Sequence, residues 1–120
     1  MPYHRAIVAA LGVALVLPAC GKSSVTLTGY AKQKWETLCV TCHGETGQGD
    51  GPKAAELKVK PRRFGDAAWQ DSVDDAAIRK IILEGGAAVG KSPDMPANED
   101  LVQQQEALSQ LIKKVRSFAP

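Results

Sequence analysis

The sequence predicts an all-α protein with one small domain. Three observations predict this fold class: apolar residues recur at helical spacing in separate stretches, glycines and prolines divide those stretches, and no strand-length run alternates apolar with polar residues. The 120 residues suit a single domain and exclude a multidomain enzyme.

The composition excludes one class of partner and suggests a gap in the core. Fifteen Lys and Arg residues oppose thirteen Asp and Glu residues, so the net charge is +2, too small for a chain built to bind nucleic acid through its phosphates. Only 5% of the residues are aromatic, a small supply of large side chains. We therefore expect no nucleic-acid partner, and we expect another apolar group to help fill the core.

Residues 1–19 have the features of a secretory signal peptide. Arg5 precedes the apolar run Ala6–Leu17, which is too short for a membrane span of about 20 residues but matches the apolar region of a signal. The alternative is a buried core helix. We expect residues 1–19 to direct export rather than to form part of the domain.

The next residues predict how the exported chain is held. Leu17-Pro18-Ala19-Cys20 resembles the lipobox of bacterial lipoproteins, which implies that Cys20 carries a lipid on the periplasmic side of a membrane. The alternative is cleavage near Ala19, which leaves Cys20 as a free thiol. Residues 20–29 are mostly small and polar and are predicted to tether a domain over residues 30–120.

The first predicted helix of the domain begins near Tyr30. Its apolar positions follow the spacing i, i+4, i+7, i+8 and i+11, so they share one face. They are Ala31, Trp35, Leu38, Cys39 and Cys42. The segment Gly44–Pro52 then holds four glycines and one proline, so we expect it to form a loop.

Helical patterns return in the second half of the chain. Residues 66–70 predict a brief helical turn that carries Trp69. Ser72 and Asp75 have the spacing of a capping box at the start of the next helix, which Gly85-Gly86 ends. Its predicted apolar face comprises Val73, Ala77, Ile78, Ile81 and Ile82.

The last predicted helix is amphipathic. Its apolar side comprises Leu101, Leu108, Leu111, Ile112, Val115 and Phe118, and its basic residues near the C-terminus are Lys113, Lys114 and Arg116. These charges complement the negative end of the helix dipole and are expected to be solvated.

The motif Cys39-Val40-Thr41-Cys42-His43 carries the predicted chemistry. C-x-x-C-H is the pattern of covalent c-type haem attachment. Two thiols one helical turn apart can add to the two vinyl groups of one porphyrin, and the adjacent imidazole of His43 can bind its iron. We therefore predict one haem c, attached through Cys39 and Cys42.

Three other uses of these residues fit less well. A thioredoxin-like dithiol needs a βαβ setting, which the pattern lacks. A structural zinc site needs four ligands, and the other Cys and His of the chain are Cys20 and His4, in or beside the signal. A bare disulfide leaves His43 and the glycine-rich loop unexplained.

The second axial ligand of the iron can be predicted by elimination. The chain has two methionines, and Met1 belongs to the signal, which leaves Met95 in the proline-flanked loop Ser92–Pro96. A lone Met is ordinarily a core filler, but here it follows a haem motif and lies in a loop whose prolines limit backbone freedom. We predict iron ligation by His43 and Met95, with Lys91 as a distant alternative.

Several segments together resemble a known family. CVTCHGETGQGDGP, PRRF and GGAAVGKSPDMPA, followed by an amphipathic C-terminal helix, are similar to a bacterial class I monohaem cytochrome c of the lipoprotein type. The likeness covers Tyr30–Pro120. It implies three to five helices wrapped around one covalently attached haem, with the N-terminal and C-terminal helices crossing. Ala31, Trp35 and Leu38 are then expected to pack against Leu108, Leu111 and Val115.

The resemblance also implies how loops surround the haem. The carbonyl of Pro52 is expected to accept a hydrogen bond from the His43 ring, with Pro61 as the competing choice. Arg62, Arg63 and Trp69 are candidates for contacts with the haem propionates. The nearby basic residues are Lys53, Lys58 and Lys60, and a solvated loop is the alternative interpretation of this local positive charge.

Two filled axial positions favour electron transfer over catalysis. We expect a membrane-anchored carrier that moves one electron between a redox protein donor and an acceptor, as a monomer or as a subunit of a respiratory complex. The alternatives are a haem enzyme or gas sensor in which Met95 is displaceable, or a fixed haem subunit of a larger redox complex. A peroxidase-like enzyme normally needs a distal acid-base group, and the exported chain has no second His.

Overall fold

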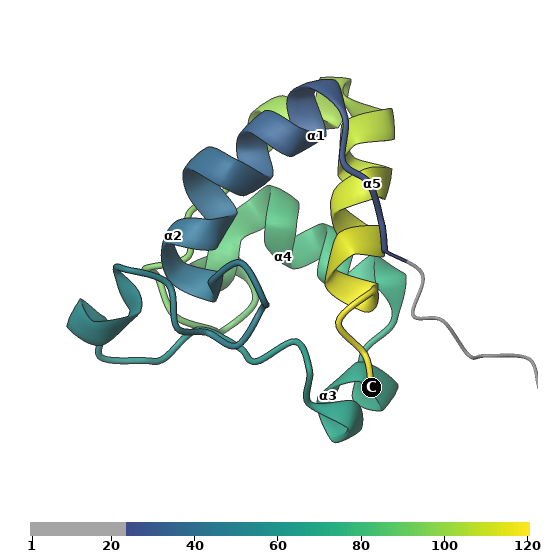
Figure 1. Cartoon of the computed structure of the whole chain (residues 1–120). Helices are drawn as coiled ribbons and strands as arrows, with labels where there is room; N and C mark the ends of the chain where they lie inside the picture. The colour runs from purple at the N-terminus through teal and green to yellow at the C-terminus, as the bar shows by residue number, and fades with distance from the viewer. Residues whose placement is uncertain (1–23) are drawn as a thin grey trace, which may run out of the picture.

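The computed structural model describes residues 24–120 and confirms the all-α prediction, because these residues form helices and loops without a strand. The α-helices are α1 (Gly29–Lys34), α2 (Val40–His43), α3 (Ala67–Ser72), α4 (Asp75–Ala88) and α5 (Gln105–Arg116). The shorter turns are the π-helical η1 (Trp35–Cys39) and the 3₁₀-helical η2 (Ala54–Glu56) and η3 (Glu99–Gln103). α1, η1 and α2 follow one another without a break, and α1 contacts α5 (Figure 1).

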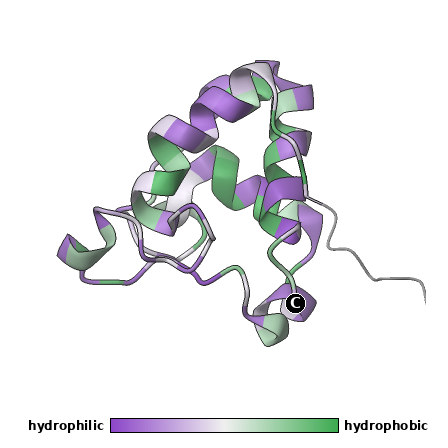
Figure 2. Cartoon of the chain, in the orientation of Figure 1, coloured by the Kyte–Doolittle hydropathy of each residue, from purple (hydrophilic) through white to green (hydrophobic). Residues whose placement is uncertain are grey.

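The core lies where the first helical segment, α4 and α5 face one another. Ala31 and Leu108 are fully buried, and both belong to one apolar cluster. The rest of the buried cluster comprises Trp35, Phe64, Ile78, Leu101, Ala107, Leu111, Ile112 and Val115. Figure 2 shows that much of α4, which lies in the middle of the domain, is apolar. The expected packing of the two terminal helices is confirmed for most positions, but Leu38 is half-buried and borders a surface hollow beside Tyr30.

The helices in the second half begin at aspartate caps. Asp66 accepts a hydrogen bond from the Trp69 N–H at 3.2 Å, which starts α3 as predicted. Asp74 accepts one from the Ala77 N–H at 2.7 Å and starts α4. The prediction that Ser72 starts α4 was wrong, because Ser72 ends α3 and its hydroxyl donates to the Trp69 carbonyl at 2.8 Å.

The end and the buried face of α4 differ in detail from the pattern. Regular helix geometry breaks at Gly85, where φ is +79°, and one further turn follows to Ala88. This agrees with the predicted stop, since the left-handed region favours glycine. Ala77 is exposed rather than on the buried face, whereas Ile82 and Leu83 pack against the core.

The predicted last helix is divided in two. Leu101 lies in η3, Gln104 has the non-helical angles φ −120° and ψ 57°, and α5 begins at Gln105. Leu101 is nevertheless buried in the same cluster as α5, and Phe118, beyond the end of α5, packs against that cluster. The apolar pattern therefore identified the buried residues correctly but joined two elements into one.

The N-terminal predictions fall mostly outside the described residues. The signal peptide over residues 1–19 and the lipid site at Cys20 lie there. Within the described part, Leu27 packs against the core and the Thr28 N–H donates to Gln110 Oε1 at 2.9 Å, so the end of the predicted tether contacts the domain. None of the helices in residues 24–120 is long and apolar enough to cross a membrane.

Candidate haem site

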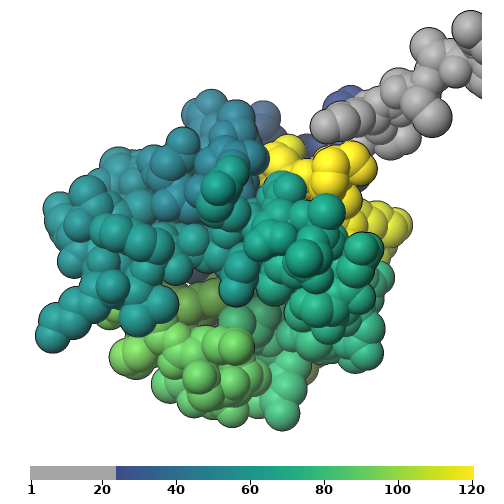
Figure 3. Space-filling view, turned by 90° about the horizontal axis from the view of Figure 1, so that it is seen from below, coloured from purple at the N-terminus to yellow at the C-terminus, as the bar shows by residue number. Residues whose placement is uncertain are grey.

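One apolar cavity brings together most of the residues that the motifs predicted. Cys39, His43 and Met95 line it together, although they come from η1, α2 and the loop after α4. The other lining residues are Lys34, Trp35, Phe64, Ile82, Asn98, Leu101, Leu111 and Val115. Figure 3 shows a narrow recess between the teal surface of the first half of the domain and the green surface of residues near 90.

The two thiols sit on the helical segment that borders this cavity. Cys39 and Cys42 are free and half-buried. Burial raises the pKa of the Cys39 thiol to about 11, and the positive charge of Lys34 opposes this shift. Both thiols are three residues apart on one helix, which is the separation that bonds to a single porphyrin require.

His43 ends α2 and is oriented by the segment around residues 62–64. Its Nδ1 donates to the Arg62 carbonyl oxygen at 3.3 Å, and its ring stacks on Phe64 with centroids 4.4 Å apart and planes at 18°. Burial lowers the pKa of His43, and the bond to Arg62 opposes that shift. The imidazole is therefore favoured in its neutral form, with Nε2 left to bind a metal.

The acceptor of this hydrogen bond differs from both expected prolines. Pro52 is exposed, and the residues on either side of it donate to α2: the Gly51 N–H to the Cys42 carbonyl at 3.1 Å and the Lys53 N–H to the Thr41 carbonyl at 2.8 Å. Pro61 directly precedes the residue whose carbonyl is used, Arg62. The predicted hydrogen bond from the His43 ring to a loop carbonyl is present, but its acceptor is Arg62, one residue after Pro61.

The glycine-rich loop closes the C-terminal end of α2. The N–H groups of Gly49 and Gly51 donate to the carbonyls of His43 and Cys42, at 2.9 and 3.1 Å, so helix-end carbonyls that lack helical partners are satisfied. A Cβ on Gly51 would lie 2.3 Å from the Val40 carbonyl oxygen and 2.5 Å from that of Thr41. Glycine is required there because backbone meets backbone.

Met95 approaches the cavity from the opposite segment. It is half-buried, its carbonyl accepts the Gly86 N–H at 2.9 Å, and the Gly86 carbonyl accepts the Lys91 N–H at 2.8 Å. A Cβ on Gly86 would lie 1.9 Å from the Ser92 carbonyl oxygen. The predicted helix-ending glycine therefore also lets the methionine loop fold back against α4.

Asn98 fastens the other end of this loop and was not predicted. It is 7% exposed, its Nδ2 donates to the carbonyls of Ile82 and Pro96 at 3.0 and 3.3 Å, and its Oδ1 accepts from Lys34 Nζ at 3.3 Å. A single Asn in a loop gives no periodic signal, so only the fold reveals this role.

The donor set fits a covalently attached haem: two thiols on one helix, an imidazole with a free Nε2, a thioether and an apolar lining. The family model of cytochrome c matches residues 30–116. The chain belongs to the cytochrome c family. A search of the curated proteins found no match, and neither did a search of the solved structures. As a member of this family, the chain holds c-type haem through Cys39 and Cys42 and is a haem-based electron carrier with redox partners.

The residues expected at the propionates lie in two different settings in this cytochrome. Arg62 pairs with Asp66 at 3.5 Å, and its guanidinium carbon lies 5.8 Å from the centroid of the Trp69 ring. Arg63 instead donates twice to Gln48 Oε1, at 3.2 and 3.1 Å. Arg62 and Trp69 are thus brought together beside Phe64 and His43, whereas Arg63 is held at the glycine-rich loop.

A buried glutamine holds the segment that orients His43. Gln70 is 7% exposed, and its Nε2 donates to the carbonyls of Phe64 and Val115 at 2.8 and 3.0 Å. The Phe64 N–H donates in turn to Gly47 at 2.8 Å. The ring that stacks on His43 is therefore fixed from both sides of its backbone.

Arg116 completes this network from α5. It donates to Gln70 Oε1 at 2.9 Å, to the Gln70 and Val73 carbonyls at 2.8 and 2.6 Å, and to Asp75 Oδ1 at 2.8 Å. The sequence predicted this arginine as a solvated complement to the helix dipole. Its main role is to join α5 to the link between α3 and α4.

Proposed function

We propose that this cytochrome is a periplasmic one-electron carrier whose haem iron is bound by His43 and Met95, and whose Cys20 anchors it to a membrane by a lipid. One observation carries the ligand assignment: the two side chains line the same apolar cavity as Cys39. The haem, when bound, supplies an iron that gains and loses one electron.

The protein side chains have distinct roles in this proposal. His43 is neutral and donates from Nδ1 to Arg62, which fixes its ring and increases the basicity of Nε2. The Met95 thioether would be the second protein ligand of the iron, and the apolar lining, including Ile82 and Leu111, would keep water away from it. An iron bound by two protein ligands would have no free site for a substrate, which favours electron transfer over catalysis.

The ligand assignment is tested by the optical spectrum of the ferric holoprotein. We expect the weak long-wavelength charge-transfer band of a methionine-iron bond in the wild type. The band should vanish in Met95→Leu, which keeps the apolar volume but removes the sulfur, and persist in Val89→Ala, a half-buried residue of the same region that does not line the cavity. A wild-type spectrum without the band would disprove the assignment.

Carbon monoxide separates the carrier from a haem enzyme or gas sensor. Because both axial positions are proposed to be filled, reduced wild-type protein should bind carbon monoxide slowly and incompletely at neutral pH. Met95→Leu should bind it rapidly. Rapid stoichiometric binding by the wild type would instead favour the open-site alternative.

The anchor and the location rest on the sequence pattern at residues 17–20, outside the described part of the chain. Mass spectrometry of the membrane fraction is expected to find a diacylglycerol-modified Cys20 as the first residue. Cys20→Ser should move the haem protein into the soluble periplasmic fraction. An unmodified N-terminus at another residue would reject the anchor and the domain division at residue 20.

A further inference from the structure

The two segments that border the cavity carry opposite charges. The basic lip, residues 53–63, has five cationic residues and one anionic residue, whereas the acidic lip, residues 91–100, has three anionic residues and one cationic residue. All of these residues are exposed. The chain's small net charge of +2 therefore conceals a strong local separation.

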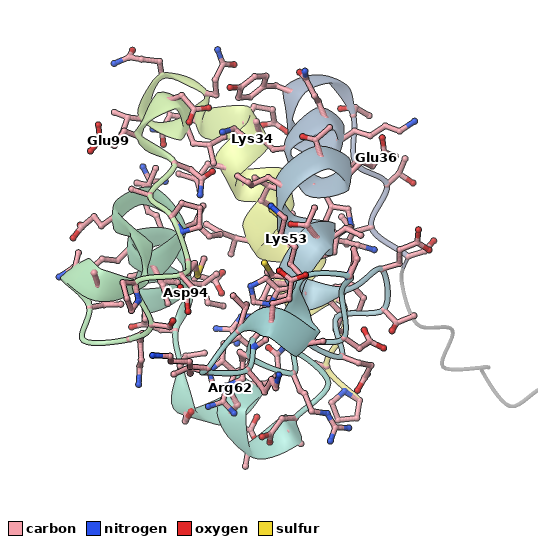
Figure 4. All side chains as sticks on the ribbon, turned by 90° about the vertical axis from the view of Figure 1, so that its left-hand side faces the viewer. Lys34, Glu36, Lys53, Arg62, Asp94 and Glu99 are labelled. Carbon is pink, nitrogen blue, oxygen red and sulfur yellow. The ribbon has the colours of Figure 1, made fainter. Side chains whose placement is uncertain are left out.

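The lips lie on opposite sides of the cavity mouth. Figure 4 shows Lys53 and Arg62 on one side and Asp94 and Glu99 on the other. The cavity lining supports this placement, since Phe64 follows the basic lip and Met95 belongs to the acidic lip. Any protein that docks over the haem crevice must therefore meet both signs of charge at once.

Part of this charge is already paired inside the molecule. Among residues 24–120, the ion pairs that involve a lip are Arg62 with Asp66 at 3.5 Å and Lys34 with Asp100 at 3.0 Å. Lys60 Nζ donates to the carbonyls of Ala54 and Ala55. Hydrogen bonds to carbonyls leave the charge of Lys60 in place. The lip residues without an ion pair in the described part of the chain are Lys53, Glu56, Lys58, Lys60 and Arg63 on the basic lip and Lys91, Asp94 and Glu99 on the acidic lip, so the two lips still have opposite net charges.

A rim of this kind is complementary to itself. When two copies face each other across a two-fold axis parallel to the crevice, each basic lip meets the partner's acidic lip, and the interface is isologous. A two-fold axis across the crevice would place like charges together, so the charges select one orientation. Complementary charge raises the rate of encounter and fixes the register of brief, small interfaces.

We propose that two copies of this cytochrome dock transiently through these lips and exchange an electron, so that the reduced copy is oxidised as the oxidised copy is reduced. The step moves one electron and no proton. It rests on the proposed carrier function, and it gives copies held on one membrane a way to pass electrons among themselves.

The test is the electron self-exchange rate, measured by NMR exchange in mixtures of reduced and oxidised wild-type holoprotein. Between about 10 mM and about 100 mM salt the Debye length falls from about 30 Å to about 10 Å. Attraction between opposite lips predicts that the rate falls at least about threefold over this range. A rate that rises with salt would overturn the proposal, because it indicates that the faces repel, as a uniformly basic rim would.

Charge swaps localise the effect. Asp94→Lys makes the rim mainly basic and Lys53→Glu weakens its basic lip, so each should lower the self-exchange rate at low salt. The double variant keeps the wild-type net charge but leaves the acidic lip without net charge, so it should exchange electrons as slowly as Asp94→Lys. A slow double variant is the outcome that overall net charge alone does not predict, and recovery of the wild-type rate would contradict the proposal.

Matched controls carry the same charge changes away from the crevice. Glu36→Lys matches Asp94→Lys, and Lys32→Glu matches Lys53→Glu; Figure 4 shows Glu36 on the side of the helix away from the acidic lip. Glu36 and Lys32 form an exposed pair at 3.8 Å, which contributes little stability. If the control variants changed the self-exchange rate as much as the rim variants do, the proposal that the copies dock through the two lips would be wrong. The methionine-iron band is recorded for every variant, so a failure of the ligand assignment is seen separately.

Discussion

The two sides of the haem cavity are built differently. On the His43 side, the proposed ligand adjoins the thiols in sequence, and its neighbours are fixed by the glycine-rich loop, by Gln70 and by Arg116. On the Met95 side, the proposed ligand is 52 residues farther along the chain and is presented by a loop that Gly86 and Asn98 hold. Substitutions on the His43 side should therefore mainly lower the free energy of unfolding. Substitutions on the Met95 side should first disrupt the proposed bond between Met95 and the iron.

The largest effect is expected from Gly51→Ala on the His side. Its Cβ would overlap two backbone oxygens of the helix that carries the thiols, so the free energy of unfolding should fall by about 3 kcal/mol. Denaturant unfolding of the holoprotein measures it. Gly65→Ala is the control, since its nearest neighbour is the flexible end of Gln48. Equal stabilities for both variants would contradict the expected rigidity of the His side.

Arg116→Ala should have the next largest effect. It leaves Gln70 Oε1 and two backbone carbonyls without their donor, which should cost about 2 kcal/mol of unfolding free energy. The methionine-iron band should survive, because Arg116 does not line the cavity. Urea unfolding and the ferric spectrum test both parts. If Arg116→Ala lost the methionine-iron band but kept the wild-type free energy of unfolding, the expected difference between the His43 side and the Met95 side would be contradicted.

Gly86→Ala tests the Met side. The added methyl group would overlap the Ser92 carbonyl, a backbone atom, so the methionine loop would have to move away from α4. We expect about 2 kcal/mol of destabilisation together with loss of the methionine-iron band. Gly90→Ala is the control. Its φ of +71° strains an alanine and should cost about 1 kcal/mol, but nothing lies near its Cβ, so the methionine-iron band should be retained. A retained band in Gly86→Ala would indicate that the loop does not depend on this contact.

The smallest effect is a pH dependence at the far end of the Met side. A hydrogen bond from the Tyr30 hydroxyl lowers the pKa of Asp100, as Lys34 also does, and the same bond raises the pKa of Tyr30. The lowered carboxyl pKa contributes stability above about pH 4 that is lost as the pH falls through the folded-state value. The raised phenol pKa contributes stability below about pH 10 that is lost as the pH rises through its folded value.

Tyr30→Phe tests this pair. In the variant, the free energy of unfolding should fall less at low pH and at high pH than it does in the wild type. The two proteins should differ most in stability at intermediate pH, where the wild type has its hydrogen bond. Both side chains are exposed, so salt should weaken the contribution of Asp100. A pH profile identical to that of the wild type would show that the contact adds nothing to stability.

Local patterns predicted the elements and the reactive residues. The C-x-x-C-H spacing predicted Cys39, Cys42 and His43, and elimination predicted Met95 as the second ligand, since each inference needs only neighbouring residues or a count. The structure places Cys39, His43 and Met95 around one cavity, and ligation by Met95 stays a prediction. The start of α4 could not be predicted from local sequence because Ser72 and Asp74 are both favourable N-cap residues. The tertiary fold selects Asp74.

The supporting contacts could not be predicted, because they join residues far apart in the sequence. Gln70 and Arg116 are separated by 46 residues, and neither stands at a position whose pattern indicates burial. The carbonyl that orients His43 belongs to Arg62, and the path of the loop, rather than the identity of its side chains, decides which carbonyl faces the ring. The role of Asn98 could not be predicted either, because it depends on hydrogen bonds with Lys34 and Ile82, which are distant in the sequence.

The π-helical turn at Trp35–Cys39 affects how the chain tolerates a change in its length. The Val40 N–H donates to the Trp35 carbonyl, five residues back, so this turn takes up one residue more than an α-helical turn. Losing one residue here would convert the π turn into an α turn, and the helix faces on either side would stay nearly aligned. Ala31 could then still face α5 while Cys39 faces the haem. The segment between Ala31 and Cys39 should therefore tolerate the loss of one residue, whereas the spacing between the two cysteines is fixed by the single porphyrin to which both are bonded.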